Sequence, residues 1–308
     1  MNDPRPKIVV LAGPTASGKT EIGIRLAESF NAEIVSADSI QLYRHMDVGS
    51  AKPSPEERAR VRHHMIDIRN PDEDFSAGDY VREARQCIRN ILEKGKLPLV
   101  VGGTGLYIRC LLGGILTLPP SQPALRRKYL EEEEKGGPGT LFRKLAELDP
   151  PSAVRTGHEN ISRIARALEI MELTGKRMSE LMLDHSFQDR PYRYLFLCLS
   201  PSREKLYERI DVRVDSMIKG GLLDEVAMLQ RRGYSRELKP MQSLGYRHAS
   251  MILAGERTVE EAIRLMKRDT RRYAKRQCTW FRSEPEVLWC DPDEIDGIGL
   301  KIDDFLGG

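Results

Sequence analysis

The chain has 308 residues, enough for two domains of ordinary size, and 40% of them are hydrophobic, which excludes a disordered chain. Its apolar runs are far shorter than the ~20 residues that a membrane-spanning helix needs, and residues 1–20 lack the layout of a secretory signal. The five cysteines are an odd number without a Cys-x-x-Cys pair, so we expect neither a disulfide framework nor a zinc site. These features predict a cytoplasmic protein that does not enter a membrane.

Strands and helices alternate in the first third of the chain. The ranges with strand character are 7–12, 33–36 and 97–101, and those with helical periodicity are 20–30 and 76–94. Ser76 is a suitable N-cap for the second helix, and Gly95 ends it. This alternation predicts an α/β fold in which helices cover both faces of a parallel sheet.

The pattern changes after residue 118. A proline-rich stretch is followed by an almost entirely helical region, and strand character returns at 192–200. The simplest arrangement is an all-helical domain, residues 119–191, inserted into an α/β domain that is formed by residues 1–118 and 192–308. Within residues 192–308 we expect long helices at 203–232 and 258–282 and a last strand at 287–290.

A phosphate-binding motif follows the first strand. Residues 13–20 read Gly-Pro-Thr-Ala-Ser-Gly-Lys-Thr and match G-x-x-x-x-G-K-[ST] in full. Backbone N–H groups of such a loop converge on phosphate oxygens, the lysine adds positive charge, and the Thr20 hydroxyl can hold Mg²⁺. The motif therefore predicts a diphosphate- or triphosphate-binding loop made of Gly13, Pro14, Thr15, Ala16, Ser17, Gly18, Lys19 and Thr20.

The acidic residue that P-loop NTPases place at a strand end to hold Mg²⁺ is missing. The best candidate strand, 97–101, runs into Gly102-Gly103-Thr104-Gly105. The strand at 33–36 instead leads to Asp38, at the end of the sheet where ligands bind. Asp38 is therefore the candidate general base or metal partner, and the alternative is a cap of the next turn. The amide of nearby Gln41 has the donor and acceptor that recognise an adenine edge.

A net charge of only +3 conceals a strongly basic segment. Residues 264–282 carry eight basic side chains against one acid, Asp269. Four of the arginines form one i,i+4 column on the expected helix, and such a column favours a polyanionic partner. They are Arg264, Arg268, Arg272 and Arg276. The alternatives are a solvated face and ion pairs with acids of the same domain.

Arg209 and Arg213 form another i,i+4 pair, on the helix after the strand at 192–200. From that helix the two guanidinium groups can reach phosphates held by the loop. Salt bridges to neighbouring acids are the alternative.

Six segments together resemble those of the bacterial tRNA dimethylallyltransferases, in that family's order and spacing. They are residues 13–20, 36–43, 48–53, 102–107, 245–247 and 274–281. The resemblance implies a P-loop NTPase-like fold and transfer of a dimethylallyl group from its diphosphate to N6 of adenosine 37 in tRNA, with Mg²⁺. Two alternative functions remain: a P-loop kinase that phosphorylates a small molecule, and a non-enzymatic RNA-binding protein whose P-loop is a nucleotide switch. We expect a monomer, and the sequence is similar to the bacterial form because it has no C-terminal zinc finger.

The resemblance also implies roles for individual residues. Asp38 would receive the N6 proton, Lys19 and Thr20 would hold the diphosphate and Mg²⁺, and Arg213 would assist. The residues implied in tRNA binding are Asp38, Ser39, Ile40, Gln41, Thr104, Arg126, Ser162, Arg163, Ile164, Ala165, Arg166, Gln242, Ser243, Leu244, Gly245, Tyr246 and Arg247.

Overall fold

The computed structural model describes residues 3–116, 118–185 and 189–308. The chain divides into two compact units, one formed by Met1–Leu112 with Arg190–Gly308 and the other by Gly113–Asp189. Both boundaries lie before those expected from the sequence, 118/119 and 191/192, since the chain leaves the first unit where helix α4 (Gly105–Gly113) ends. Among the described residues, no helix has both the length and the apolar character needed to cross a bilayer.

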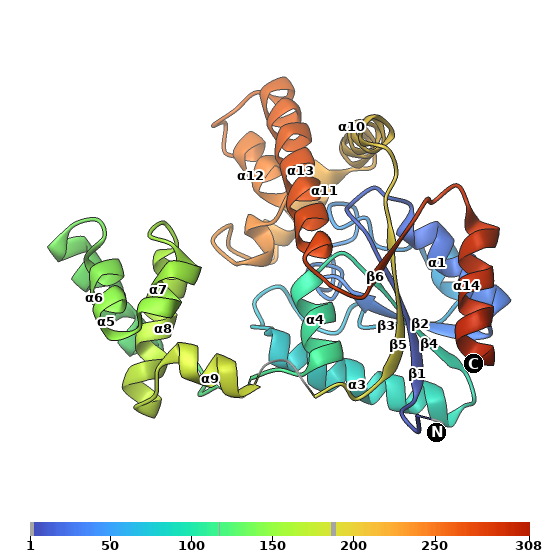
Figure 1. Cartoon of the computed structure of the whole chain (residues 1–308). Helices are drawn as coiled ribbons and strands as arrows, with labels where there is room; N and C mark the ends of the chain where they lie inside the picture. The colour runs from blue at the N-terminus through green and yellow to red at the C-terminus, as the bar shows by residue number, and fades with distance from the viewer. Residues whose placement is uncertain (1–2, 117, 186–188) are drawn as a thin grey trace. The chain divides into compact units, whose positions relative to one another are not determined.

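The first unit is built on one parallel sheet, in which the described strands run in the order β3-β2-β4-β1-β5-β6 (Figure 1). The strands are β1 (Lys7–Ala12), β2 (Ala32–Ala37), β3 (His63–His64), β4 (Leu97–Gly102), β5 (Arg193–Leu199) and β6 (Val287–Cys290). Its other helices are α1 (Lys19–Ser29), α2 (Pro55–Arg60), α3 (Ala77–Glu93), α10 (Arg203–Lys219), α11 (Leu222–Arg231), the 3₁₀ turn η1 (Pro240–Gln242), α12 (Tyr246–Leu253), α13 (Val259–Arg282) and α14 (Ile295–Gly307). The predicted α/β class with a parallel sheet is confirmed.

Alternating residues of the central strand face two separate hydrophobic cores. Val9 and Leu11 of β1 pack with apolar residues of α1 and α14, whereas Ile8 and Val10 pack with residues of α3 and α4 (Figure 1). Burial on both sides explains why β1 reads as a continuous apolar run. The sheet is therefore a middle layer, and its carboxyl edge is left for loops.

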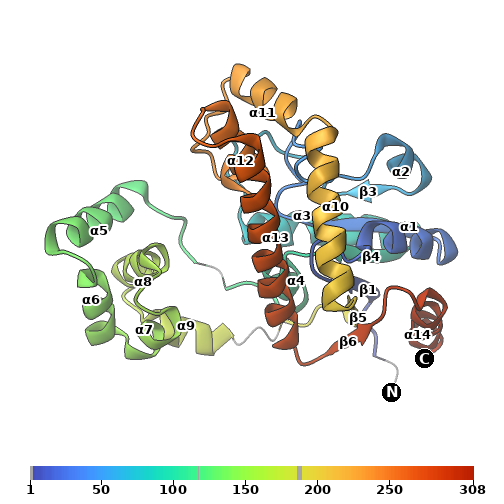
Figure 2. The same cartoon turned by 90° about the horizontal axis from the view of Figure 1, so that it is seen from above.

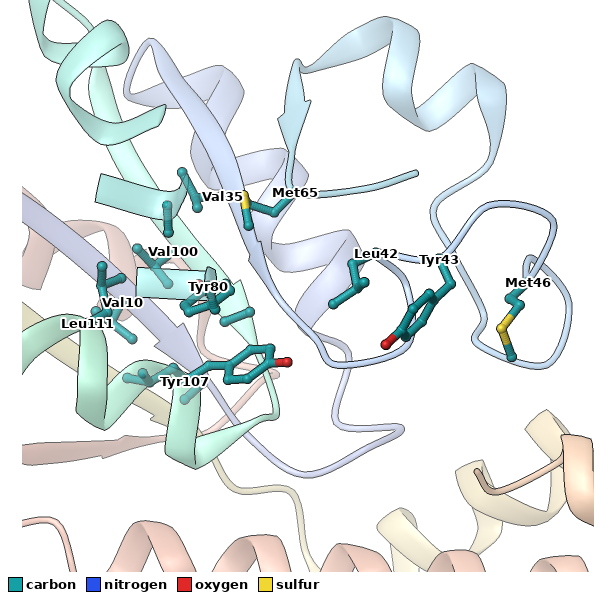
Figure 3. Packing of buried hydrophobic residues seen from close by; sticks show 14 of the residues in the cluster. Val10, Val35, Leu42, Tyr43, Met46, Met65, Tyr80, Val100, Tyr107 and Leu111 are labelled. Atoms are coloured by element: carbon teal, nitrogen blue, oxygen red, sulfur yellow. The ribbon is translucent and has the colours of Figure 1, made fainter. Parts of the chain in front are cut away.

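The segment after β2 is anchored in the larger of these cores. Leu42, Tyr43 and Met46 are buried, and Figure 3 shows them in the loops that follow this strand. Deeper in the same core, Tyr80 and Tyr107 stack with ring centroids 4.3 Å apart, close to Val100 (Figure 3). The loop that begins at Asp38 is thus held by packing.

One expected helix is two helices. The range 203–232 is interrupted at Gly220 and Gly221, where α10 ends and α11 begins. Gly221 has φ of 93°, a left-handed conformation that glycine adopts without strain. The prediction of a single helix was wrong, because the buried residues keep helical spacing within α10 and within α11 but not from Met217 to Leu222, across the glycine pair.

The second unit is all-helical in the part that the structure describes. Its helices are α5 (Pro123–Gly136), α6 (Thr140–Leu148), α7 (Pro150–Thr156), α8 (Ile161–Thr174) and α9 (Met178–His185). Leu141, Leu145, Ile164 and Leu168 form its core together with Tyr129. This unit therefore has its own hydrophobic core.

A buried carboxylate lies at the amino end of β2. Glu33 contacts His64 Nε2 at 2.7 Å, Lys96 Nζ at 3.0 Å and Lys94 Nζ at 3.5 Å. Burial alone would raise the pKa of Glu33, but the hydrogen bonds from His64 and Lys96 and the lysine charges lower it to about 2. Because the folded-state pKa is depressed, this group stabilises the fold above its unfolded pKa, and the contribution is lost as pH falls towards 2.

We therefore expect Glu33→Gln to lower the free energy of unfolding by about 3 kcal/mol at neutral pH. The difference from the wild type should shrink as pH is lowered from about 5 to about 2. Denaturant unfolding of both proteins over this range measures it, with Glu28→Gln as the control, because Glu28 forms only an exposed pair with Arg60. A difference that does not change with pH would contradict this account of Glu33.

Candidate functional site

The phosphate-binding motif forms the turn between β1 and α1. Gly18 is the N-cap of α1 with φ of 94°, and no side chain of the described residues caps that helix end. The N–H groups of the first turn are therefore free to bind an anion, as a phosphate loop requires. Within the turn, Ser17 N donates to Pro14 O over 3.3 Å and closes the loop.

Lys19 is folded back onto the loop. Its Nζ donates to Pro14 O at 2.6 Å and lies 3.4 Å from Ser17 Oγ. Burial, followed by the charge of Arg213, lowers the pKa of Lys19 to about 8, and Asp38 opposes this shift. An anionic ligand in the loop would therefore interact with two cations, Lys19 and Arg213. Arg213 donates to Ser50 O at 3.4 Å and has no ion pair among the described residues.

Asp38 lies immediately after β2 and faces the same space. Its Oδ1 accepts hydrogen bonds from Ile40 N at 2.8 Å and Gln41 N at 3.2 Å. The carboxylate therefore does cap the next turn, which was the alternative to a functional role. All hydrogen bonds to it from the described residues use Oδ1, so Oδ2 remains available to a ligand.

Close contact between strands explains why β4 ends in glycine instead of an acid. A β-carbon at position 102 would lie 2.2 Å from the carbonyl oxygen of Ala37 at the end of β2. No larger side chain fits there without moving the strands apart. Asp38, one residue beyond β2, is therefore the carboxylate that reaches the phosphate loop.

A cavity of about 990 Å³ in the first unit collects most of the expected site residues. Those that line it are Thr15, Ala16, Ser17, Gly18, Lys19, Thr20, Asp38, Ser39, Ile40, Gln41, Arg213, Gln242, Ser243, Leu244 and Arg247. Arg209 lines it too and lies 3.7 Å from Asp293, so the alternative of an ion pair holds for Arg209. The cavity therefore brings together the phosphate loop, the Asp38 carboxylate, Arg213 of α10 and residues between 242 and 247.

Other expected residues support the cavity without lining it. Gly13 and Pro14 are the buried first residues of the loop, and Thr104 Oγ1 accepts a hydrogen bond from Ser39 N at 3.1 Å. Tyr246 is fully buried, and its hydroxyl donates to Glu225 at 2.7 Å beside Gly245. The side chain of Tyr246 is therefore part of the scaffold.

The second unit holds the remaining residues that the resemblance implied in RNA binding. Ser162 and Arg163 are exposed, and Arg126 donates to the Ser162 hydroxyl. Ile164 and Ala165 are buried in the core of this unit. Arg166 pairs with Glu169 at 2.8 Å. The exposed groups at this place are thus Ser162 and Arg163, with Arg126 and Arg166 partly exposed beside them.

Sequence reasoning missed one wall of the cavity. Met266, Thr270, Tyr273 and Gln277 of α13 line it, together with Arg276, the last member of the arginine column. The sequence pointed to that column but indicated no role in the site for the other four residues. Thr270 and Gln277 lie on the same helical stripe as the apolar Met266, Ala274 and Phe281, and polar residues on such a stripe were a signal that this face is more than core.

The basic helix has two kinds of cations. Lys267 pairs with Asp215 at 2.8 Å and Arg271 pairs with Asp211, both acids belonging to the neighbouring α10 (Figure 2). Within the described part of the chain, the ion pairs of Arg268 and Arg272 are with Asp269 of their own helix alone, and their side chains are 52% and 65% exposed. Arg268 and Arg272 therefore face outward, Arg276 also lines the cavity, and Lys267 and Arg271 hold α13 against α10.

The oxygen donors beside the loop suit a hard divalent cation. The structure contains no group of three or more His, Cys, Asp or Glu side chains that could hold a metal, within its described ranges. The Thr20 hydroxyl and the Asp38 carboxylate nevertheless both line the cavity. Mg²⁺ commonly needs only one or two protein oxygens when phosphates and water complete its shell, so the residues present fit this ion.

Comparisons with known proteins agree with one another. Residues 41–284 match the family model described as IPP transferase. The chain is 50% identical to a tRNA dimethylallyltransferase of Syntrophotalea carbinolica, covering 99% of this chain and 98% of that protein, and 45% identical to one of Geobacter sulfurreducens, covering 98% of each. The crystal structure of a tRNA isopentenylpyrophosphate transferase from Bacillus halodurans is similar, with a TM-score of 0.74, 39% identity and coverage of 98% and 97%. A eukaryotic dimethylallyltransferase acting on tRNA gives a TM-score of 0.82 at 28% identity, covering 98% of this chain and 80% of that one.

Proposed function

The chain belongs to the IPP transferase family of tRNA dimethylallyltransferases, and on that basis we propose that it transfers a dimethylallyl group from dimethylallyl diphosphate to N6 of adenosine 37 in tRNA. The family resemblance and the P-loop-type fold expected from the sequence are both confirmed. The observation that carries the reaction proposal is the single cavity in which Asp38 faces the phosphate loop. That arrangement brings a proton acceptor and a diphosphate site together.

Asp38 is proposed to accept the proton. The exocyclic nitrogen of adenine is a weak nucleophile because its lone pair is delocalised into the ring. As the N6–C bond forms and the bond from carbon to the diphosphate oxygen breaks, the N6 proton passes to Oδ2 of Asp38. The Ile40 and Gln41 amides hold Oδ1 and so fix the direction of the other oxygen.

Lys19, Arg213 and the loop amides are proposed to stabilise the departing diphosphate. Their positive charges and N–H dipoles are in place before the reaction, so little reorganisation is needed when charge develops on the leaving group. The Lys19 ammonium has three N–H groups, so it can donate to a diphosphate and keep its hydrogen bond to Pro14 O. Arg213 approaches from α10 on the side of Ser50.

Mg²⁺ is proposed to bind with the diphosphate, held by the Thr20 hydroxyl. When bound, it would neutralise charge on the diphosphate oxygens. The protein would then supply one or a few oxygen ligands, with the remainder from phosphate and water.

The remaining parts of the proposal concern the RNA acceptor, the prenyl donor, the oligomeric state and the cellular location. tRNA as the acceptor is supported by the names of the similar bacterial proteins and by the structure of the eukaryotic relative acting on tRNA. We propose that the protein works in the cytoplasm as a monomer, with dimethylallyl diphosphate as the donor.

Incubation with radiolabelled dimethylallyl diphosphate, Mg²⁺ and unmodified tRNA tests the reaction. We expect label in the RNA and no turnover of ATP added in a parallel reaction. A kinase would instead consume ATP, and a nucleotide-switch protein would bind RNA without labelling it. Unlabelled RNA together with ATP turnover would contradict the proposal.

A further inference from the structure

A buried amide joins α13 to the phosphate loop. Gln277 is 7% exposed and lies on the inward face of α13, between the buried Ala274 and Phe281. Its Oε1 accepts a hydrogen bond from Thr15 N at 2.9 Å, and its Nε2 donates to Gly103 O at 2.8 Å. One side chain thus bridges the loop after β1 and the turn after β4.

The bridge acts on the peptide unit that also holds Lys19. The peptide bond between Pro14 and Thr15 points its N–H at Gln277 and its carbonyl oxygen at Lys19 Nζ, 2.6 Å away. Rotating this peptide plane would break both contacts at once. Gln277 therefore fixes the orientation of the group that holds the Lys19 ammonium beside the loop.

The chemistry at this point requires an uncharged amide. The side chain must accept from an N–H on one side and donate to a carbonyl on the other, which an apolar residue cannot do and a carboxylate can do only when protonated. Leaving the Thr15 N–H and the Gly103 carbonyl without partners in a buried place would be unfavourable.

The neighbouring glycine allows this close approach. A β-carbon at position 103 would lie 2.4 Å from Gln277 Nε2, so any other residue there would displace the amide. Gly103 has no positive φ, and alanine would be compatible with its backbone. The bridge can therefore be disturbed from either of its two ends.

We infer that Gln277 is a positioning residue that holds the Pro14–Thr15 peptide, and through it Lys19, in the orientation that binds the diphosphate of the prenyl donor. This role rests on the proposed function, in which the loop binds a diphosphate. The inward face of α13 would thus help to bind the diphosphate, whereas the outward Arg268 and Arg272 would bind RNA.

Inorganic pyrophosphate with Mg²⁺ is the probe, and its binding is measured by calorimetry without turnover. Gln277→Leu should weaken pyrophosphate binding about 10- to 100-fold, the scale expected when a donor and an acceptor beside the loop lose their hydrogen-bond partner. The affinity for tRNA should stay within about twofold, because the arginine column is untouched. Gln230→Leu is the matched control, since Gln230 is a partly buried glutamine of α11 whose side chain donates to Ser250 and does not line the cavity of the phosphate loop. Its pyrophosphate affinity should equal that of the wild type.

Two further variants distinguish positioning from a general loss of stability. With Gln277→Glu, the deficit relative to wild type should shrink as pH is lowered, because the protonated carboxyl again donates to Gly103 O while accepting from Thr15 N. Gly103→Ala should weaken pyrophosphate binding alone but add little in the Gln277→Leu background, since both act on one bridge. These variants also carry the test if Gln277→Leu does not fold.

Three results would overturn the inference: unchanged pyrophosphate affinity in folded Gln277→Leu, a deficit of Gln277→Glu that does not change with pH, or fully additive effects of Gly103→Ala and Gln277→Leu. A wild-type protein that binds pyrophosphate but transfers no dimethylallyl group would instead overturn the proposed function. The two failures are therefore distinguishable.

Discussion

Asp38→Ala is expected to reduce turnover of prenyl transfer about 10²- to 10⁴-fold, the usual contribution of a general base. The loss should appear in kcat, because the carboxylate acts on the proton of a bound nucleotide and not on the diphosphate. Single-turnover transfer with saturating tRNA and donor measures it. Binding of tRNA and of pyrophosphate should change little.

Asp38→Asn separates the two roles that the structure gives this residue. The asparagine oxygen can still accept from the Ile40 and Gln41 amides, so the cap is retained, but no proton acceptor remains. We therefore expect Asp38→Asn to fold like the wild type and to be nearly as inactive as Asp38→Ala. Near-normal turnover of Asp38→Asn would show that Asp38 is only a cap.

Replacing Arg268 and Arg272 together by Gln is expected to weaken binding to any tRNA and to flatten its salt dependence. Each phosphate neutralised by an arginine contributes about 0.7 to 0.9 to the slope of log K against log salt concentration, so the slope should fall by about one to two units. At about 0.1 M salt this corresponds to a loss of roughly 10- to 100-fold in affinity. Binding isotherms at four salt concentrations measure it, and pyrophosphate affinity should not change.

The matched control uses the other cations of the same helix. Lys267→Gln with Arg271→Gln removes the same charge but breaks the pairs with Asp215 and Asp211 of α10. This double variant should lower the melting temperature and keep most of the salt slope. If the Arg268 and Arg272 variant behaved in this way instead, with an unchanged slope, the outward column would have no role in binding RNA.

Local signals predicted the elements that position the reaction. The full phosphate motif between a strand and a helix placed residues 13–20, and the rule that parallel strands end at one edge brought Asp38 to them. These two predictions need only short stretches of sequence and the fact that the carboxyl ends of parallel strands lie at one edge of a sheet. The Ser76 cap of α3 was predictable in the same way and is present as a capping box with Asp79.

What the sequence could not predict depends on tertiary packing. Gln277 reaches the loop only because α13 crosses the ends of β1 and β4, and no local pattern contains that crossing. Ile164 was implied in RNA binding together with its neighbours in the chain, but on a helix adjacent residues face different directions, and its side chain belongs to the core. The break at Gly220 and Gly221 is different, because a glycine pair inside a helical range is itself a signal that a helix ends.

The most direct measurement of the central claim is the mass spectrum of nucleosides from an unmodified tRNA treated with the purified protein, dimethylallyl diphosphate and Mg²⁺. A matched transcript with guanosine at position 37 serves as the control. We predict N6-(dimethylallyl)adenosine from the first RNA, in an amount that depends on Asp38, and none from the second. Unmodified adenosine throughout, from a protein that binds both the tRNA and pyrophosphate, would contradict the account.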